Sequence, residues 1–205
     1  MKTSRLEAFS DGVLAIIITI MVLELKVPHE HTLDALREEA GTGLLTYLLS
    51  FVYIGIYWNN HHHMFQLTER ITGGVLWANL HLLFWLSLYP FTTAWMDESE
   101  FARIPVVVYG VNLLAAAIAY YVLQSLIIRA EGDDSPLRRA IGVDLKGKLS
   151  PALYTAGIVA ALMITEESNT MTWIALAFYV TVAVIWLVPD RRLEHVIVEQ
   201  GGEGP

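Results

Sequence analysis

The chain has 205 residues, of which 55% are hydrophobic and 17% charged, with a formal net charge of −8. Soluble domains carry about 45–50% apolar and about 25% charged residues, so this composition excludes an ordinary soluble globule and indicates a membrane protein. The absence of cysteine excludes disulfide bonds, thiolate zinc sites, iron–sulfur clusters and a cysteine nucleophile. The acidic balance argues against nucleic acid as a partner.

Six apolar runs follow one another along the chain, and each has roughly the length that a helix needs to cross about 30 Å of hydrocarbon. They extend over 9–25, 44–59, 74–96, 105–128, 151–165 and 171–188. Each run is continuously apolar, which predicts helix, because backbone polar groups in lipid must be satisfied within their own segment. The polar segment 129–148 is the one long linker. We therefore expect an all-α polytopic membrane protein with six transmembrane helices over residues 1–192 and a cytoplasmic tail over 193–205.

Basic residues predict the orientation of these helices. Placing both termini on one side of the membrane gathers ten of the 13 lysines and arginines there, and cytoplasmic loops are the ones enriched in these residues. The ten are Lys2, Arg5, Arg70, Arg129, Arg138, Arg139, Lys146, Lys148, Arg191 and Arg192, which leaves Lys26, Arg37 and Arg103 opposite. We therefore expect both termini in the cytoplasm. The opposite loops are acidic, which indicates either an anionic vestibule that concentrates cations or simply a solvated surface.

Polar side chains gather at the inner ends of the first three runs. They are Arg5, Glu7, Ser10 and Asp11 on the first, His61, His62 and His63 on the second, and Asn79 and His81 on the third. Because ionisable groups at membrane depth are costly when unpaired, we expect Asp11 to pair with Arg5 or with a histidine of another helix. Ser10 and Asn79 would complete the hydrogen bonds. The alternative is that each cluster anchors its own helix at the membrane interface.

The first run carries an aliphatic stripe. At about 100° per residue, Ile16, Ile20 and Leu23 share one face of a helix. Thr19 borders this face, whereas Asp11 falls on the far side. If the stripe faces a pore, Asp11 therefore contacts the protein bundle and is not a pore-lining carboxylate. Periodicity alone leaves open whether the stripe faces a pore, lipid or the protein core.

Sequence patterns of catalytic chemistry are missing. Consecutive residues of a helix point about 100° apart, so His61, His62 and His63 do not converge on one metal ion. The H-E-H segment at 29–31 lacks the spacing of a zinc protease helix. The sequence contains no nucleophile elbow, phosphate-binding loop or dinucleotide fingerprint. We expect no enzyme activity, no bound metal and no cofactor.

Four short motifs stand in the first half of the chain: R-x-x-x-F-S-D at 5–11, Y-W-N-N-H-H at 57–62, N-L at 79–80 and Y-P-F-T-T at 89–93. Together they resemble the transmembrane protein 175 family, the lysosomal potassium channels of animals and their prokaryotic homologues. The last three helices match this family in hydropathy and length alone. A single six-helix unit is similar to the prokaryotic form, whereas the animal protein carries two such units.

The resemblance implies a potassium-permeable cation channel, made of four copies of the chain in the lipid bilayer of a prokaryotic cell membrane. In this family the first helix of each subunit lines the central pore and narrows it with rings of aliphatic side chains. These rings would be Ile16, Ile20 and Leu23, and Thr19 would offer a hydroxyl to a passing ion.

The resemblance also implies a structural role for the first motif. Its residues Arg5, Phe9, Ser10 and Asp11 are expected to hold the first helix against the second and third, with His61, His62 and Asn79 as partners. A secondary transporter or proton-linked carrier is the alternative function, although neither internal repeats nor a midplane carboxylate are seen. A membrane-embedded enzyme or haem protein that uses the histidines is the third hypothesis.

Overall fold

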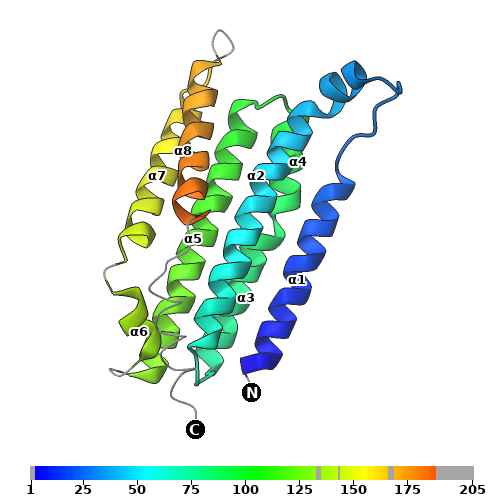
Figure 1. The fold of residues 1–205 in the computed structure, drawn as a ribbon. Coiled ribbons are helices and arrows are strands. Elements are labelled where there is room, and N and C mark those ends of the chain that lie inside the picture. Colours follow the sequence, from blue (N-terminus) through cyan, green and yellow to red (C-terminus); the bar gives the residue numbers. More distant parts are fainter. Residues whose placement is uncertain (1–2, 133–134, 143, 166–168, 188–205) are drawn as a thin grey trace.

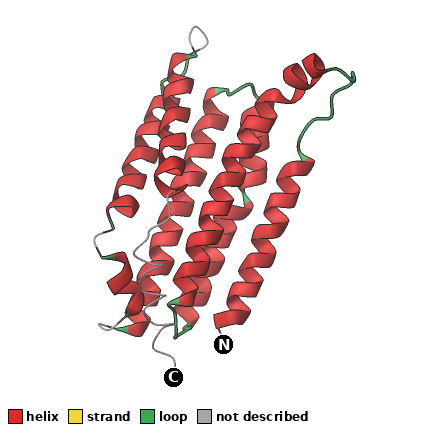
Figure 2. Ribbon diagram, in the orientation of Figure 1, coloured by secondary structure: helices red, strands yellow, loops and turns green. Residues whose placement is uncertain are grey.

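The computed structural model describes residues 3–132, 135–142, 144–165 and 169–187, with the backbone alone for Glu39. In this described part the chain forms eight helices (Figure 2). They are α1 (Thr3–Leu23), α2 (Leu33–Gln66), α3 (Gly73–Ser87), α4 (Tyr89–Glu98), α5 (Arg103–Glu131), α6 (Pro136–Ile141), α7 (Leu145–Leu162) and α8 (Thr170–Leu187). The expected all-α fold is therefore confirmed for the described residues.

The long helices run up and down in one bundle (Figure 1). α1 stands at one edge and packs against α2, α3 and α4, while α5 contacts α3, α4, α7 and α8. Four of the largest fully buried side chains are tyrosines, namely Tyr53, Tyr89, Tyr109 and Tyr179. The helices α2, α4, α5 and α8 therefore meet around aromatic rings, and α1 is an outer helix of this unit.

The third apolar run, expected as one helix over 74–96, is divided between α3 and α4 at Leu88. Pro90 stands in the first turn of α4, where it has no N–H to donate to the carbonyl of Leu86 and its ring crowds that carbonyl. The combined segment Gly73–Glu98 is still long and apolar enough for one membrane crossing. The proline therefore interrupts the helix without ending the crossing.

Five segments of the described residues are long and apolar enough to cross a membrane, where six were expected. They are Thr3–Leu23, Ala40–Gln66, Gly73–Glu98, Arg103–Glu131 and Thr170–Leu187. The expected fifth run lies in α7, which has 18 residues and carries Lys146 and Lys148 near its start. These two charges make α7 less apolar as a whole than its C-terminal part is. α7 nevertheless packs along α8, which is one of the five segments (Figure 1). A sixth crossing at α7 therefore stays a prediction.

Several helices extend beyond the apolar runs because polar residues also form helical turns. α2 begins at Leu33, and the hydroxyl of Thr32 caps it by accepting a hydrogen bond from the N–H of Ala35 at 3.1 Å. The expected linker 129–148 contains the short helix α6. The centre of that linker's turn, most of the turn between α7 and α8, the last residue of the sixth run and the tail over 193–205 lie outside the described residues.

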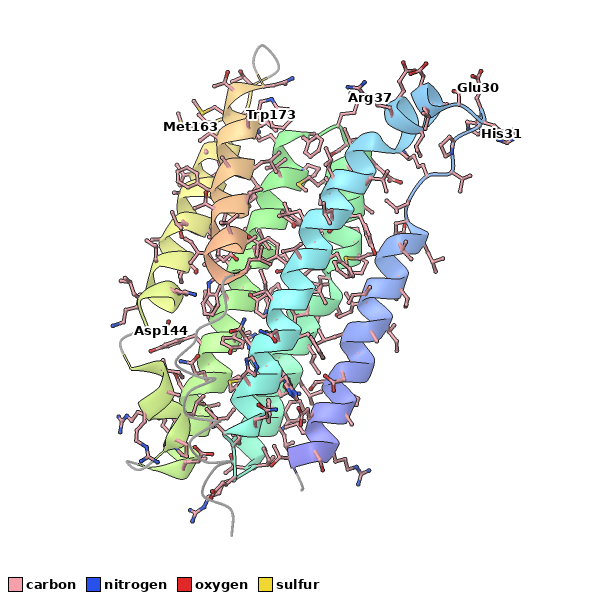
Figure 3. All side chains as sticks on the ribbon, in the orientation of Figure 1. Glu30, His31, Arg37, Asp144, Met163 and Trp173 are labelled. Atoms are coloured by element: carbon pink, nitrogen blue, oxygen red, sulfur yellow. The ribbon has the colours of Figure 1, made fainter. Side chains whose placement is uncertain are left out.

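The charged loops lie at the two ends of the bundle. Glu30, His31 and Arg37 are at the end opposite to the N-terminus (Figure 3), and α5 starts there with Arg103. This separation follows from the alternating direction of the helices. The assignment of the N-terminal end to the cytoplasm stays a prediction.

Candidate functional site

α1 has a buried face and an exposed face. Its buried residues are Leu6, Ser10, Leu14, Ile17 and Met21. Their spacing of three or four residues is that of one helix face, and this face packs against α2, α3 and α4. The one hydroxyl among four apolar side chains marks the point where α1 makes a buried polar contact.

The opposite face of α1 presents aliphatic side chains that the described helices leave uncovered. The exposed fractions are 59% for Ile16, 41% for Ile20 and 80% for Leu23. Thr19 is exposed beside them, and its hydroxyl donates to the carbonyl of Ile16 at 2.8 Å. The structure thus places the three aliphatic residues on one face, as expected, and their role in a pore stays a prediction.

Ser10, Asn79 and His61 form one hydrogen-bonded chain across three helices. The Asn79 amide donates to the Ser10 hydroxyl at 2.9 Å, and the Asn79 oxygen accepts from His61 Nε2 at 2.8 Å. The Ser10 hydroxyl in turn donates to the carbonyl of Leu6 at 3.0 Å. The three side chains are buried. Because an amide oxygen only accepts, this bond requires the His61 proton on Nε2, and the buried Nδ1 has no partner among the described residues.

The carboxylates of α1 take their partners on α2. Asp11 accepts a hydrogen bond from Trp58 Nε1 at 3.0 Å, so the expected pairing of Asp11 with Arg5 or a histidine is wrong. Glu7 takes the histidine instead, with 2.5 Å between Glu7 Oε1 and His62 Nδ1. Glu7 precedes Asp11 by one helical turn, so both lie on the flank of α1 that faces α2. The carboxylate nearer the N-terminus is the one that reaches His62.

Two residues of the first motif stand outside this network. Arg5 is exposed and Phe9 is 53% exposed, because both project from the side of α1 away from Ser10. The expectation that they hold α1 against α2 and α3 therefore stays a prediction. Neither Glu7 as the partner of His62 nor Trp58 as the partner of Asp11 was predicted from the sequence. A carboxylate near the start of the first apolar run and an indole N–H near the end of the second could have indicated such contacts.

The histidines of α2 are directed to different helices. His61 bonds to α3 and His62 to α1, as the turn of about 100° between consecutive helical residues requires. Among the described residues, no group of three or more His, Cys, Asp or Glu side chains comes together as a metal ion would need. The arrangement joins helices.

The residues of this network lie within a match to a known protein family. Residues 5–90, which contain the whole Ser10–Asn79–His61 chain, match the family model of the endosomal/lysosomal potassium channel TMEM175. A potassium channel of a Chryseobacterium species is 50% identical over 97% of this chain and 100% of its own length. The human endosomal/lysosomal proton channel TMEM175 is 25% identical over 94% of this chain and 41% of its own length.

A solved structure has the same architecture. The crystal structure of a lysosomal potassium-selective channel TMEM175 homologue from Chamaesiphon minutus has a TM-score of 0.75 and 29% identity to this chain, covering 92% of this chain and 97% of that one. The relatives are channels, in agreement with the expectation that the chain is not an enzyme. With half of its residues identical to those of a relative along nearly its whole length, this chain belongs to the TMEM175 family.

Proposed function

We propose that four copies of this chain form a potassium-permeable channel whose central pore is lined by α1 of each subunit. Two bacterial relatives support potassium as the ion. The Chryseobacterium protein, at 50% identity, is named a potassium channel, and the Chamaesiphon structure is that of a potassium-selective homologue. The human relative, named a proton channel, is less similar at 25% identity.

The exposed aliphatic face of α1 is the observation that carries the proposal. Ile16, Ile20 and Leu23 lie uncovered along this face, while buried hydrogen bonds from Ser10 hold the opposite face. Homo-oligomers have closed symmetry, so the same helix of each subunit can face one axis. In a fourfold assembly, each of the three aliphatic positions then forms a ring around the pore.

A ring of Ile16 side chains acts as a hydrophobic gate. Methyl groups cannot replace the water around a cation, so a narrow ring excludes both water and ions. Opening widens the ring until an ion keeps part of its water shell. Selectivity then comes from the lower cost of dehydrating potassium than sodium, and we expect it to be modest because no tailored ligands surround the ion. Thr19 adds a hydroxyl oxygen beside the rings.

The base of α1 supplies the pivot for opening. Ser10 is fixed to Asn79 on α3, while Gly12, one turn before Ile16, has no atom of another helix within 4 Å of the position where a Cβ would stand. α1 therefore has room to bend just after its anchored end. A small tilt at Gly12 changes the width of the Ile16 ring.

Replacing Ile16 with a polar residue tests the gate. Ile16→Asn in planar bilayers should raise the leak current and bring the potassium and sodium permeabilities closer, because the amide keeps the ring wet. Val111→Asn on α5 changes another aliphatic side chain that is 45% exposed, and this control should leave the currents unchanged. Unchanged currents in Ile16→Asn would remove Ile16 from the gate.

The cysteine-free sequence allows the pore position to be tested separately. In Ile16→Cys, a charged thiol reagent should block the current, and oxidation should cross-link subunits. Val111→Cys should show neither effect. A monomer in solution would contradict the fourfold pore, and saturable flux without single-channel steps would support the carrier instead.

A further inference from the structure

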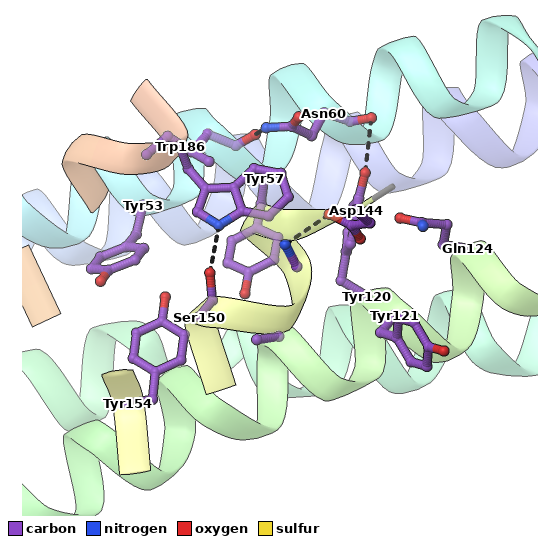
Figure 4. Close-up of a pocket in the computed structure, with 13 residues that line it drawn as sticks. Tyr53, Tyr57, Asn60, Tyr120, Tyr121, Gln124, Asp144, Ser150, Tyr154 and Trp186 are labelled. Atoms are coloured by element: carbon purple, nitrogen blue, oxygen red, sulfur yellow. Dashed lines mark hydrogen bonds between the residues drawn. The ribbon is translucent and has the colours of Figure 1, made fainter. Parts of the chain in front are cut away.

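A cavity lies between α2, α5, α7 and α8 (Figure 4). It contains about 540 Å³ of space, part of which is open to the surroundings. Tyr121, which is 59% exposed, stands at its rim. No described residue of α1 lines it, so the cavity is separate from the proposed pore.

Three aromatic rings line this cavity, and the planes of neighbouring rings are steeply inclined to each other. The ring centroids of Tyr57 and Tyr120 are 6.0 Å apart at 61°, and those of Tyr120 and Trp186 are 6.4 Å apart at 71°. In each of these contacts the edge of one ring lies against the face of the other, so these three rings are not stacked in parallel, and the faces that no ring edge covers keep their negative charge density. Lys146 already places its ammonium group 6.0 Å from the centroid of Trp186. One ring of the wall therefore accepts a cation.

Two polar side chains complete the lining. Asp144 is the one charged residue among the described residues that line the cavity, and its Oδ1 caps α7 by accepting from the N–H of Gly147 at 2.7 Å. Gln124 is 8% exposed and lines the same cavity. Its amide extends toward Asp144 in Figure 4. The amide of Gln124 is therefore available to a hydrogen-bonding group of a molecule bound in the cavity.

We propose that this cavity binds a small organic ammonium ion, held against the rings and beside the carboxylate of Asp144. The rings attract a cation through their faces, and the carboxylate supplies the opposite charge. The amide oxygen of Gln124 accepts a hydrogen bond from the ligand. A neutral molecule of the same shape that carries the same hydroxyl keeps the apolar contact and the bond to Gln124, but it loses the attraction of the rings and of Asp144 for its charge. An anion is repelled by Asp144.

Choline and its uncharged isostere 3,3-dimethylbutan-1-ol test the charge requirement. Calorimetric titration of the whole assembly, in a detergent without lipid, should show choline binding about tenfold tighter than the alcohol. Asp144→Asn should weaken choline binding by about tenfold and leave binding of the alcohol unchanged, because asparagine keeps the helix cap. Lys146→Gln should tighten choline binding by about twofold, because it removes a like charge beside Trp186.

Two further variants test the amide contact and the location of the bound choline. Gln124→Met keeps the volume without the amide and should weaken choline binding by about threefold. Ile16→Asn should leave choline binding unchanged, and its loss there would assign the choline to the pore instead. Equal binding of choline and the alcohol, or choline binding that is insensitive to Asp144→Asn, would overturn the proposal.

Discussion

Asn79 joins three helices through one side chain, because its amide bonds to Ser10 on α1 and to His61 on α2. Asn79→Leu keeps a similar volume but removes the shared partner of two buried polar groups. We expect it to lower the free energy of unfolding by about 1–3 kcal/mol, the range for such bonds in membrane helices and buried sites. Thermal unfolding of the solubilised assembly measures this loss.

Ser87→Ala is a control on the same helix. The Ser87 side chain is exposed, and its hydroxyl donates to the carbonyl of Phe84 within α3 at 2.8 Å. Its removal should change the free energy of unfolding by less than about 0.5 kcal/mol. Equal losses for the Ser87 and Asn79 variants would mean that the contact between helices contributes nothing beyond a local hydroxyl.

The carboxylates of α1 show how much of the site could be predicted residue by residue. The helical period places Asp11 away from Ile16, and Asp11 does contact α2 through Trp58. The period does not reveal that Glu7 is the carboxylate that meets His62. That choice depends on the offset between α1 and α2 along their axes, which the lengths of apolar runs leave undetermined.

At the scale of helices, α5, α7 and α8 approach closely at two glycines. A Cβ on Gly157 would lie 2.5 Å from Cε1 of Tyr179, and a Cβ on Gly110 would lie 2.0 Å from the Tyr179 hydroxyl. The ring of Tyr179 is fully buried, so it cannot move aside unless the helices separate. Gly157→Ala should therefore lower the free energy of unfolding by about 1–3 kcal/mol, as overpacking does, in the same thermal measurement.

Gly55→Ala makes the same chemical change on α2 in open space. No atom of another helix lies within 4 Å of the position where its Cβ would stand, so the better helix propensity of alanine should raise the free energy of unfolding by up to about 1 kcal/mol. The two glycine variants are thus expected to differ in sign. Losses of the same size in both would exclude close packing at Tyr179 as the cause.

Apolar runs predict which segments form the long helices, but not where those helices begin and end in the polar loops. α2 starts at Leu33 because Thr32 caps a polar turn that hydropathy does not detect. The break at Leu88 was readable from Pro90, whereas α6 lies within a polar linker and depends on tertiary burial of Leu137. Helix ends in the loops therefore follow from caps and local packing, which act over a few residues.

At the scale of the whole molecule, the uncovered face of α1 adjoins an acidic groove. The groove is lined by Ile20, Glu24, Ser87, Pro90, Phe91, Ala94, Trp95 and Glu98. In the proposed channel, Glu24 lies at the pore mouth opposite to the N-terminus. The sequence predicts acidic residues at this end of the bundle, but it does not predict that they lie next to Ile20. That proximity depends on how α1 packs against α4.

Glu24 should raise the local potassium concentration through its field. Glu24→Gln is expected to lower the single-channel conductance for potassium entering from that side by about twofold at low ionic strength. The effect should vanish near 1 M salt, because the Debye length falls from about 30 Å at 0.01 M to about 3 Å at 1 M. Recordings at both salt concentrations measure it.

Glu69→Gln removes the same charge from an exposed residue at the other end of the bundle, where the hydroxyl of Thr3 on α1 donates to the carbonyl of the neighbouring Thr68. At low ionic strength it should lower the conductance for potassium entering from the Glu24 side much less than Glu24→Gln does, because Glu69 lies at the far end of the bundle. Near 1 M it should have no effect, because several Debye lengths then separate it from that mouth. If Glu24→Gln instead lowers the conductance equally at 1 M, Glu24 acts by touching the ion or shaping the mouth. A concentrating field at the groove would then be excluded.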